Sequence, residues 1–376
     1  VLRLVLAFAV SVVTARYLGK ELFGRLNYAI SFVMLFSALG SLGLNDILVR
    51  ELVRRDAPSG AGAILGTAVV LRLLGTALMS VLALVLAVAL GRSPQVIGMM
   101  AIICLSYALL NPAQVFERFF EARVQARYSS IAQALAIMVS AASSVVLIHL
   151  GVGVTWFAAV KVLESAVLLV ILLALVPRAG GRWSWTCDRT LTRPLLHDGW
   201  PLMLTGVFIM IYMRIDQVMI EHFLGEGAVG VYAVAVRLSE AWYFVPTVVA
   251  SSVFPAILAA RHQENRIYTH RLQLLYELMT WLGHAVALPT TFLAPVVIRW
   301  VYGAEYADAA TVLALYVWAG IFVFQGVARG KWIVSEGLQR YEVDQTDLHR
   351  MFAAMLNFAA ERLDDGRNLG PIGQPG

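Results

Sequence analysis

Single arginines interrupt the apolar stretches of this sequence and have few acidic residues to neutralise them. Four such residues, Arg3, Arg25, Arg72 and Arg237, are spread over both halves of the chain. A charge held at the centre of a bilayer costs at least about 2.5 kcal/mol, so such groups normally face a protein interior or a water-filled space. The guanidinium group is a planar fork of donors that matches a phosphate, so these arginines predict a wet, cationic cavity for an anionic head group.

Other charged residues inside apolar stretches are paired at helical spacing. Lys161 and Glu164, and likewise Arg237 and Glu240, are three residues apart and can neutralise each other on one helix face. We interpret the Lys161–Glu164 pair as a contact that holds helices together. The other charged residues could also have a purely structural role. Arginines near the end of an apolar stretch can extend their side chains to the membrane surface.

Enzyme chemistry has little support in this sequence. We find no Ser/His/Asp arrangement, no glycine-rich phosphate loop and no paired carboxylates at a plausible spacing, and the loops on one side are all short. The seven histidines form no metal-ligand cluster, and the two cysteines, Cys104 and Cys187, cannot form a disulfide framework. We therefore expect no enzymatic activity, no metal and no cofactor.

The elements that must position these charges are membrane-spanning helices. The chain is 60% hydrophobic and only 14% charged, with a mean hydropathy of +0.75. About ten stretches are long enough to cross roughly 30 Å of hydrocarbon. They lie at about 1–17, 25–48, 61–90, 95–113, 130–149, 153–177, 198–220, 229–259, 272–299 and 309–328.

Arginine and lysine are concentrated in every second loop between these stretches. Because short basic loops stay on the cytoplasmic side, the loops around Arg54, Arg123, Arg189 and Arg266 are predicted to be cytoplasmic. The sparse loops around Lys20, Arg92 and Glu226 are predicted to face outside. The net charge of +5 then reflects basic loops beside the anionic lipid of a phospholipid bilayer, and it gives no reason to expect nucleic acid.

An internal repeat divides the chain into two halves of the same orientation. The segment 17–24 recurs as 223–230, at an offset of 206 residues, and both copies follow the first span of a half. This favours parallel repeats related by an axis along the membrane normal. We expect a six-helix lobe at 1–177, a cytoplasmic linker at 178–197, an incomplete four-helix lobe at 198–341, and a polar tail at 342–376 that looks truncated or shifted in frame.

Several segments resemble a known family. Ala15–Gly24, Gly40–Leu44 and Leu48–Leu52 are similar to the N-terminal region of polysaccharide biosynthesis proteins. Ile211–Met219, Leu224–Gly225 and Gly230–Leu238 are similar to the signature of their second half. These are the Wzx-type O-antigen and exopolysaccharide flippases of the multidrug/oligosaccharidyl-lipid/polysaccharide exporter superfamily, and the resemblance covers about residues 1–341.

The resemblance implies an all-α, V-shaped transporter with two six-helix lobes around a central cavity, in the inner membrane of a bacterium. Its cargo would be an undecaprenyl-pyrophosphate-linked oligosaccharide, carried from the cytoplasmic to the periplasmic leaflet by alternating access. Its protein partners would be a polysaccharide polymerase and co-polymerase. Arg3 and Arg72 by position, and Arg214 and Asp216 by motif, are the residues expected in its cavity.

Two other functions are left open by the sequence. A small-molecule exporter of the same superfamily would use a pair of carboxylates in one lobe for cation coupling, and the excess of basic residues inside the spans argues against it. A degenerate membrane protein that transports nothing is the second alternative, because the second lobe lacks two spans of the family pattern.

Overall fold

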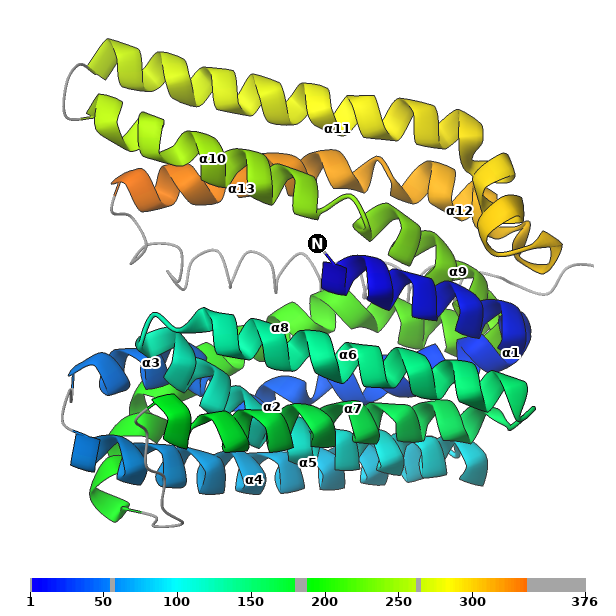
Figure 1. Ribbon diagram of the computed structural model, residues 1–376. Helices are drawn as coiled ribbons and strands as arrows, with labels where there is room; N and C mark the ends of the chain where they lie inside the picture. The colour runs from blue at the N-terminus through cyan, green and yellow to red at the C-terminus, as the bar shows by residue number, and fades with distance from the viewer. Residues whose placement is uncertain (1, 55–57, 180–187, 262–264, 337–376) are drawn as a thin grey trace, which may run out of the picture. The chain divides into compact units, whose positions relative to one another are not determined.

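The computed structural model describes residues 2–54, 58–179, 188–261 and 265–336, and within these ranges all regular structure is helical. The elements are α1 (Leu2–Leu35), α2 (Ser37–Ser41), α3 (Leu44–Arg54), α4 (Pro58–Ala89), α5 (Pro94–Ala122), α6 (Ala126–His149), α7 (Val154–Leu175), η1 (Pro177–Ala179), α8 (Arg189–Leu224), α9 (Glu226–Glu240), α10 (Phe244–Arg261), α11 (Asn265–Val301), η2 (Ala304–Tyr306), α12 (Ala309–Tyr316) and α13 (Ala319–Glu336) (Figure 1).

Eight helices of the described chain are long and apolar enough to cross a membrane, or nine when the bent pair Val5–Leu35 and Ser37–Arg54 is counted as one span. The prediction of an all-α, multi-pass membrane protein is therefore confirmed. The expected spans from 61 to 328 each correspond to one of the eight. The expected spans at 1–17 and 25–48 both begin within α1, so their relation depends on the course of that helix.

Helix α1 consists of two arms that lie side by side. Gly19 has φ 70° and ψ 171°, which breaks the helix, and Figure 1 shows α1 turning back on itself. The guanidinium of Arg237 donates to Ser11 in the first arm and to Asn27 in the second. In an unbroken helix those two residues would be roughly 24 Å apart. The arms thus run back along each other, and the second continues through α2 and α3 after a bend of 50°.

Contacts between residues divide the chain into two units. Unit 1 is Val1–Ala241 with Thr290–Tyr316, and unit 2 is Trp242–Pro289 with Val317–Gly376. The core of unit 1 includes Phe32, Phe116 and Phe120, whereas the described part of unit 2 packs around Ile257, Leu275, Met279, Phe324 and Ala328. These units cut across the expected second lobe, so the lobe boundary at 178–197 stays a prediction. Residues 180–187 of that linker and the whole tail at 342–376 lie outside the described residues, whereas residues 189–197 form the start of α8.

The loops predicted to face outside gather at one end of unit 1. Tyr17 donates to the carbonyl of Val152 at 3.0 Å, and the backbone N–H of Lys20 donates to Glu305 at 2.8 Å. At the same end Arg25 forms an ion pair with Glu226, and Arg92 forms one with Glu221. The gathering agrees with the predicted alternation of loops, while the assignment of this end to the outside stays a prediction.

The two copies of the repeat have the same backbone and contact each other reciprocally. Gly225 has φ 82° and ψ 177°, close to the angles of Gly19, which stands 206 residues earlier. A Cβ built on Gly24 would lie 1.8 Å from the carbonyl oxygen of Glu226, and one built on Gly230 would lie 2.0 Å from that of Lys20. The offset of 206 converts the first contact into the second, so the copies are related by an approximate twofold axis.

Candidate functional site

A cluster of charged side chains lies where α8 and α9 pack against both arms of α1. Arg237 donates to Ser11 and, at 2.9 Å, to Asn27 Oδ1. Arg214 and Glu240 lie close enough to Arg237 to interact with it electrostatically. On the neighbouring face, Tyr232 donates its hydroxyl hydrogen to the carboxylate of Asp216. The cluster therefore contains two arginines and two carboxylates inside helices that are otherwise apolar.

The charged groups of two members of this cluster form no hydrogen bond or ion pair with any described residue. Arg214 forms no hydrogen bond or ion pair with any residue that the structure describes, and its Nε is buried without a partner. Glu240 likewise forms none within the described ranges, although Arg214, Arg237 and Asp216 are its electrostatic neighbours. A charge without a fixed partner inside a membrane is costly, which makes it a candidate for binding a ligand.

The repeat shows that packing does not require these charges. Subtracting 206 from the five charged or phenolic positions gives Phe8, Val10, Leu26, Ser31 and Met34 in the first copy, and none of these is charged. The equivalent hydrogen bonds are nevertheless present: Arg237 donates to Ser11, and Ser31 donates to Gln217 at 2.7 Å. Since this contact forms in the first copy without a charged side chain, it does not by itself explain the charges at Arg214, Asp216 and Glu240.

The chemistry of this site suits an anionic or mixed-charge ligand better than a metal ion. Arg237 is committed to α1, so it positions the two arms and contributes positive potential. Arg214 has the free donor fork that a phosphate needs. Among the described residues, no group of three or more His, Cys, Asp or Glu side chains could hold a metal ion.

Arg72 is placed differently from our expectation. It is 0% exposed, and it donates to Asn45 Oδ1 at 2.6 Å, Gln114 Oε1 at 3.1 Å and the carbonyl of Asn111 at 3.2 Å. These partners lie on α3 and α5, so Arg72 joins three helices. Its Nη1 and Nη2 groups donate to these neutral partners, whereas its Nε is buried without a hydrogen-bond partner. Its role as a cargo-binding residue stays a proposal that requires these helices to separate.

The remaining predicted residues fall at the ends of the helices. Arg25 forms an ion pair with Glu226, with Nε and Oε2 2.8 Å apart, and donates to Gln95 at 3.1 Å. It therefore ties α1 to α9 and α5 and is not an unpaired cavity arginine. Arg3 belongs to α1, but its side chain lies outside the described residues.

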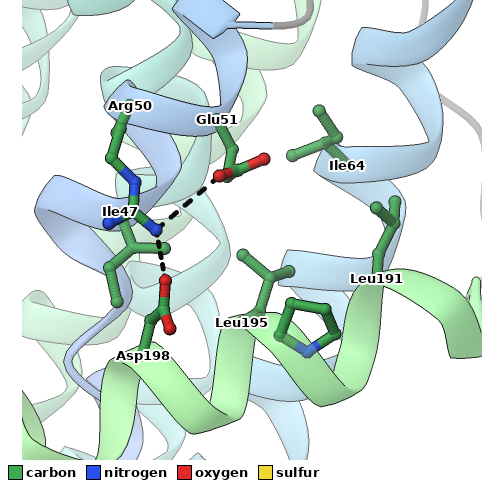
Figure 2. A pocket seen from close by; sticks show the side chains of 8 residues that line it. Ile47, Arg50, Glu51, Ile64, Leu191, Leu195 and Asp198 are labelled. Atoms are coloured by element: carbon green, nitrogen blue, oxygen red, sulfur yellow. Dashed lines mark hydrogen bonds and ion pairs between the residues drawn. The ribbon is translucent and has the colours of Figure 1, made fainter.

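A second contact joins α3 to α8 at the opposite end of unit 1. Figure 2 shows Arg50 between Glu51 and Asp198, and it forms ion pairs with both. Nearby, a Cβ on Gly199 would lie 2.6 Å from the carbonyl oxygen of Leu42, so the backbones of the two helices touch. The cavity beside Arg50 measures about 20 Å³ and has room for about one water molecule. This region therefore holds helices together and offers no ligand site.

A larger cavity surrounds the Lys161–Glu164 pair that we interpreted as a helix contact. The pair is present, with Nζ and Oε2 2.9 Å apart, but both residues line a cavity of about 210 Å³ among α1, α5, α6 and α7. Their spacing alone gave no sign of it. Tyr107 and Ser165, which also line this cavity, were not singled out at all, because a hydroxyl in an apolar stretch carries little signal.

The fold defines the class: a multi-pass α-helical membrane protein with a charged cluster among its helices. The chain belongs to the polysaccharide biosynthesis protein family, whose model matches residues 1–261. A search of curated proteins found no match.

Solved structures confirm the fold at low sequence identity. The lipid II flippase MurJ in an inward closed conformation is 13% identical with a TM-score of 0.67, and the match covers 89% of this chain and 74% of that one. An inward-facing multidrug resistance MATE family transporter of the MOP superfamily is 17% identical with a TM-score of 0.61, covering 89% and 83%. A mutant of the Vibrio cholerae MATE transporter VcmN is 13% identical with a TM-score of 0.54, covering 89% and 83%.

Proposed function

We propose that this protein is a flippase that moves an undecaprenyl-pyrophosphate-linked oligosaccharide from the cytoplasmic to the periplasmic leaflet of a bacterial inner membrane. The family supports a role in polysaccharide synthesis, and the fold supports transport. The translocated oligosaccharide would then be used in O-antigen or exopolysaccharide assembly, with a polymerase and co-polymerase as partners. The protein itself makes and breaks no covalent bond.

The observation that carries this proposal is the uncommitted guanidinium of Arg214. It stands in a cluster whose charges belong to one copy of the repeat only, and Arg237 beside it adds a second positive charge. A pyrophosphate entering from the membrane could accept hydrogen bonds from the guanidinium group of Arg214. No existing hydrogen bond of Arg214 would have to break first. Arg237 acts through position, because it holds the two arms of α1 around the site.

Alternating access also needs contacts that close one end and can be broken. The pairs Arg25–Glu226 and Arg92–Glu221 close the end where the expected outside loops gather. The Arg50–Asp198 pair at the opposite end of unit 1 is formed at the same time. In our proposal the pairs at the two ends separate in alternation, one end opening when cargo enters and the other when it leaves.

The test uses the full chain in proteoliposomes that contain a fluorescent undecaprenyl-pyrophosphate-linked oligosaccharide, with flipping measured by a quencher that cannot enter. We expect wild type to flip the lipid and Arg214→Ala to reduce the rate at least tenfold. Arg214→Lys should fall between them, because it keeps the charge without the fork. Arg193→Ala, at an exposed position of the same helix, is the matched control and should behave as wild type.

One further function has support from the same cluster. Asp216 and Glu240 are two carboxylates within electrostatic reach of each other, as a cation-coupled small-molecule exporter would need. The proteoliposome assay separates the two functions. Uptake of a cationic dye driven by a proton or sodium gradient, without movement of the lipid, would favour the exporter and contradict the flippase.

A further inference from the structure

The cavity around Lys161 and Glu164 is lined by six polar side chains, Ser106, Tyr107, Gln133, Lys161, Glu164 and Ser165. Lys161 Nζ and Ser140 Oγ both donate to Glu164 Oε2, at 2.9 and 3.0 Å, which leaves Glu164 Oε1 without a donor among the described residues. Tyr107 and Ser165 line the same cavity, and neither hydroxyl forms a hydrogen bond with a residue that the structure describes. Ser165 is 6% exposed, so its free hydroxyl is confined to the interior.

The charge balance of the cavity selects the kind of ligand. A metal cation would have to compete with the ammonium group that already neutralises Glu164, and an anion would have to compete with the carboxylate that already neutralises Lys161. A neutral ligand that both donates and accepts hydrogen bonds meets neither obstacle. It could use Glu164 Oε1 as an acceptor, Lys161 as a donor and the two hydroxyls as either.

The size and lining of the cavity narrow the ligand further. Its volume of about 210 Å³ is small beside the roughly 300–1,000 Å³ of pockets for drug-sized ligands, so it suits a single ring. Ile103, Leu110 and Leu168 line the cavity together with the polar groups. A sugar ring has an apolar C–H face and a rim of hydroxyls, and this combination matches the mixed lining of the cavity.

We propose that this cavity binds one sugar ring of the lipid-linked oligosaccharide, an inference that rests on the proposed function. Tyr107 links the two sites, because it lines the cavity and lies within electrostatic reach of Arg214. The cargo would thus place its pyrophosphate at Arg214 and a neighbouring sugar beside Tyr107. Substrate choice among glycans would then depend on α5 and α7, while the charged cluster would accept any pyrophosphate.

The test measures sugar binding without lipid or transport. Full-length protein in detergent is titrated with methyl glycosides of hexoses, 6-deoxyhexoses, N-acetylhexosamines and uronic acids, and thermal unfolding and saturation-transfer NMR report binding. We expect saturable binding of at least one neutral glycoside. The double variant Tyr107→Phe/Ser165→Ala removes two hydroxyls without disturbing the ion pair and should weaken that binding about tenfold.

The matched control is Tyr128→Phe/Ser129→Ala, which removes the same two groups from the start of α6, outside the cavity. It should bind glycoside as wild type does. Equal unfolding temperatures of the three proteins without sugar show that folding is intact. Absence of binding by every glycoside, equal loss in both double variants, or displacement of the glycoside by sodium ions would overturn the sugar site.

Failure of this inference and failure of the flippase are distinguishable. A protein that flips the lipid-linked oligosaccharide but binds no glycoside contradicts the sugar site and leaves the flippase standing. A protein that binds a glycoside through Tyr107 and Ser165 but flips nothing supports the cavity and contradicts the proposed transport.

Discussion

Gly24 and Gly230 lie against each other although 206 residues separate them in the chain. A Cβ built on Gly230 would stand 3.2 Å from the backbone nitrogen of Gly24, and each glycine also packs on a carbonyl oxygen of the other repeat. Neither position has room for a side chain. The closest approach between the repeats is therefore built from backbone, and it occurs where the sequence of one copy most resembles the other.

We expect Gly24→Ala and Gly230→Ala to destabilise the protein by similar amounts, about 1–3 kcal/mol each, because each added methyl group meets backbone that must move. Thermal unfolding in detergent measures the effect. Gly98→Ala on α5 is the control: nothing lies within 4 Å of its Cβ, so alanine should be neutral or slightly stabilising. Equal unfolding temperatures for all three variants would contradict the close packing.

The Arg92–Glu221 pair should matter far more for stability than an exposed pair. Its side chains are only 16% and 12% exposed, and Arg92 also stands over the ring of Tyr28 at 5.1 Å. Removing one partner leaves a buried charge, so Arg92→Ala should cost about 3–5 kcal/mol. Glu121→Ala breaks the exposed Arg118–Glu121 pair and should cost less than about 1 kcal/mol. A double variant Arg92→Ala/Glu221→Ala that is no more stable than Arg92→Ala would argue against this explanation.

Arg237 should be sensitive even to a conservative change. A single lysine ammonium cannot replace two guanidinium nitrogens that donate separately to Ser11 and Asn27. Arg237→Lys should therefore cost about 1–2 kcal/mol of stability, equivalent to one lost buried hydrogen bond. The lysine can donate to only one of the two acceptors, Ser11 or Asn27. In the Arg237→Lys background, alanine at the acceptor that lysine does not reach should therefore have little further effect on stability. Arg193→Lys is the control, and additive losses in every combination would contradict a shared contact.

The sidedness of the loops can be measured by cysteine labelling. In a background without Cys104 and Cys187, a reagent that cannot cross the membrane should modify Lys20→Cys from outside intact cells and spare Arg189→Cys. Permeabilised cells should label both. Modification of Arg189→Cys in sealed cells would reverse the predicted orientation, although the gathering of the loops at one end of unit 1 would remain.

Periodicity predicted the placement of the eight spans between 61 and 328 well, because the thickness of the hydrocarbon layer sets a minimum length that can be read from the sequence. The expected total of about ten compares with eight or nine candidate spans in the described residues. The turn at Gly19 was also visible, since the repeat marked Gly19 and Gly225 as equivalent. The bend between α1 and α2 was not predicted, because no proline or charge marks its position at Phe36.

The site was harder to predict, because the sequence shows charges but not their partners. No acidic residue near Arg72 in the sequence indicates a partner, yet Asn45 and Gln114 accept hydrogen bonds from its Nη groups, and neutral amides in an apolar stretch carry little signal in the sequence. Conversely, Lys161 and Glu164 looked satisfied, and their pair stands beside an open cavity. Only the three-dimensional arrangement distinguishes an arginine that has neutral partners from one, like Arg214, that has none among the described residues.

The one-sided distribution of charge has a consequence for how such proteins diversify. In this protein the first copy supplies the backbone fit at its glycines and a few polar contacts, while the second carries the charged cluster. Substitutions at the charged positions of α8 and α9 can thus change the cluster without disturbing the frame that the glycines maintain. A designer could exploit the same separation by transplanting the polar positions of α8 and α9 between relatives and leaving the glycine-rich junction untouched.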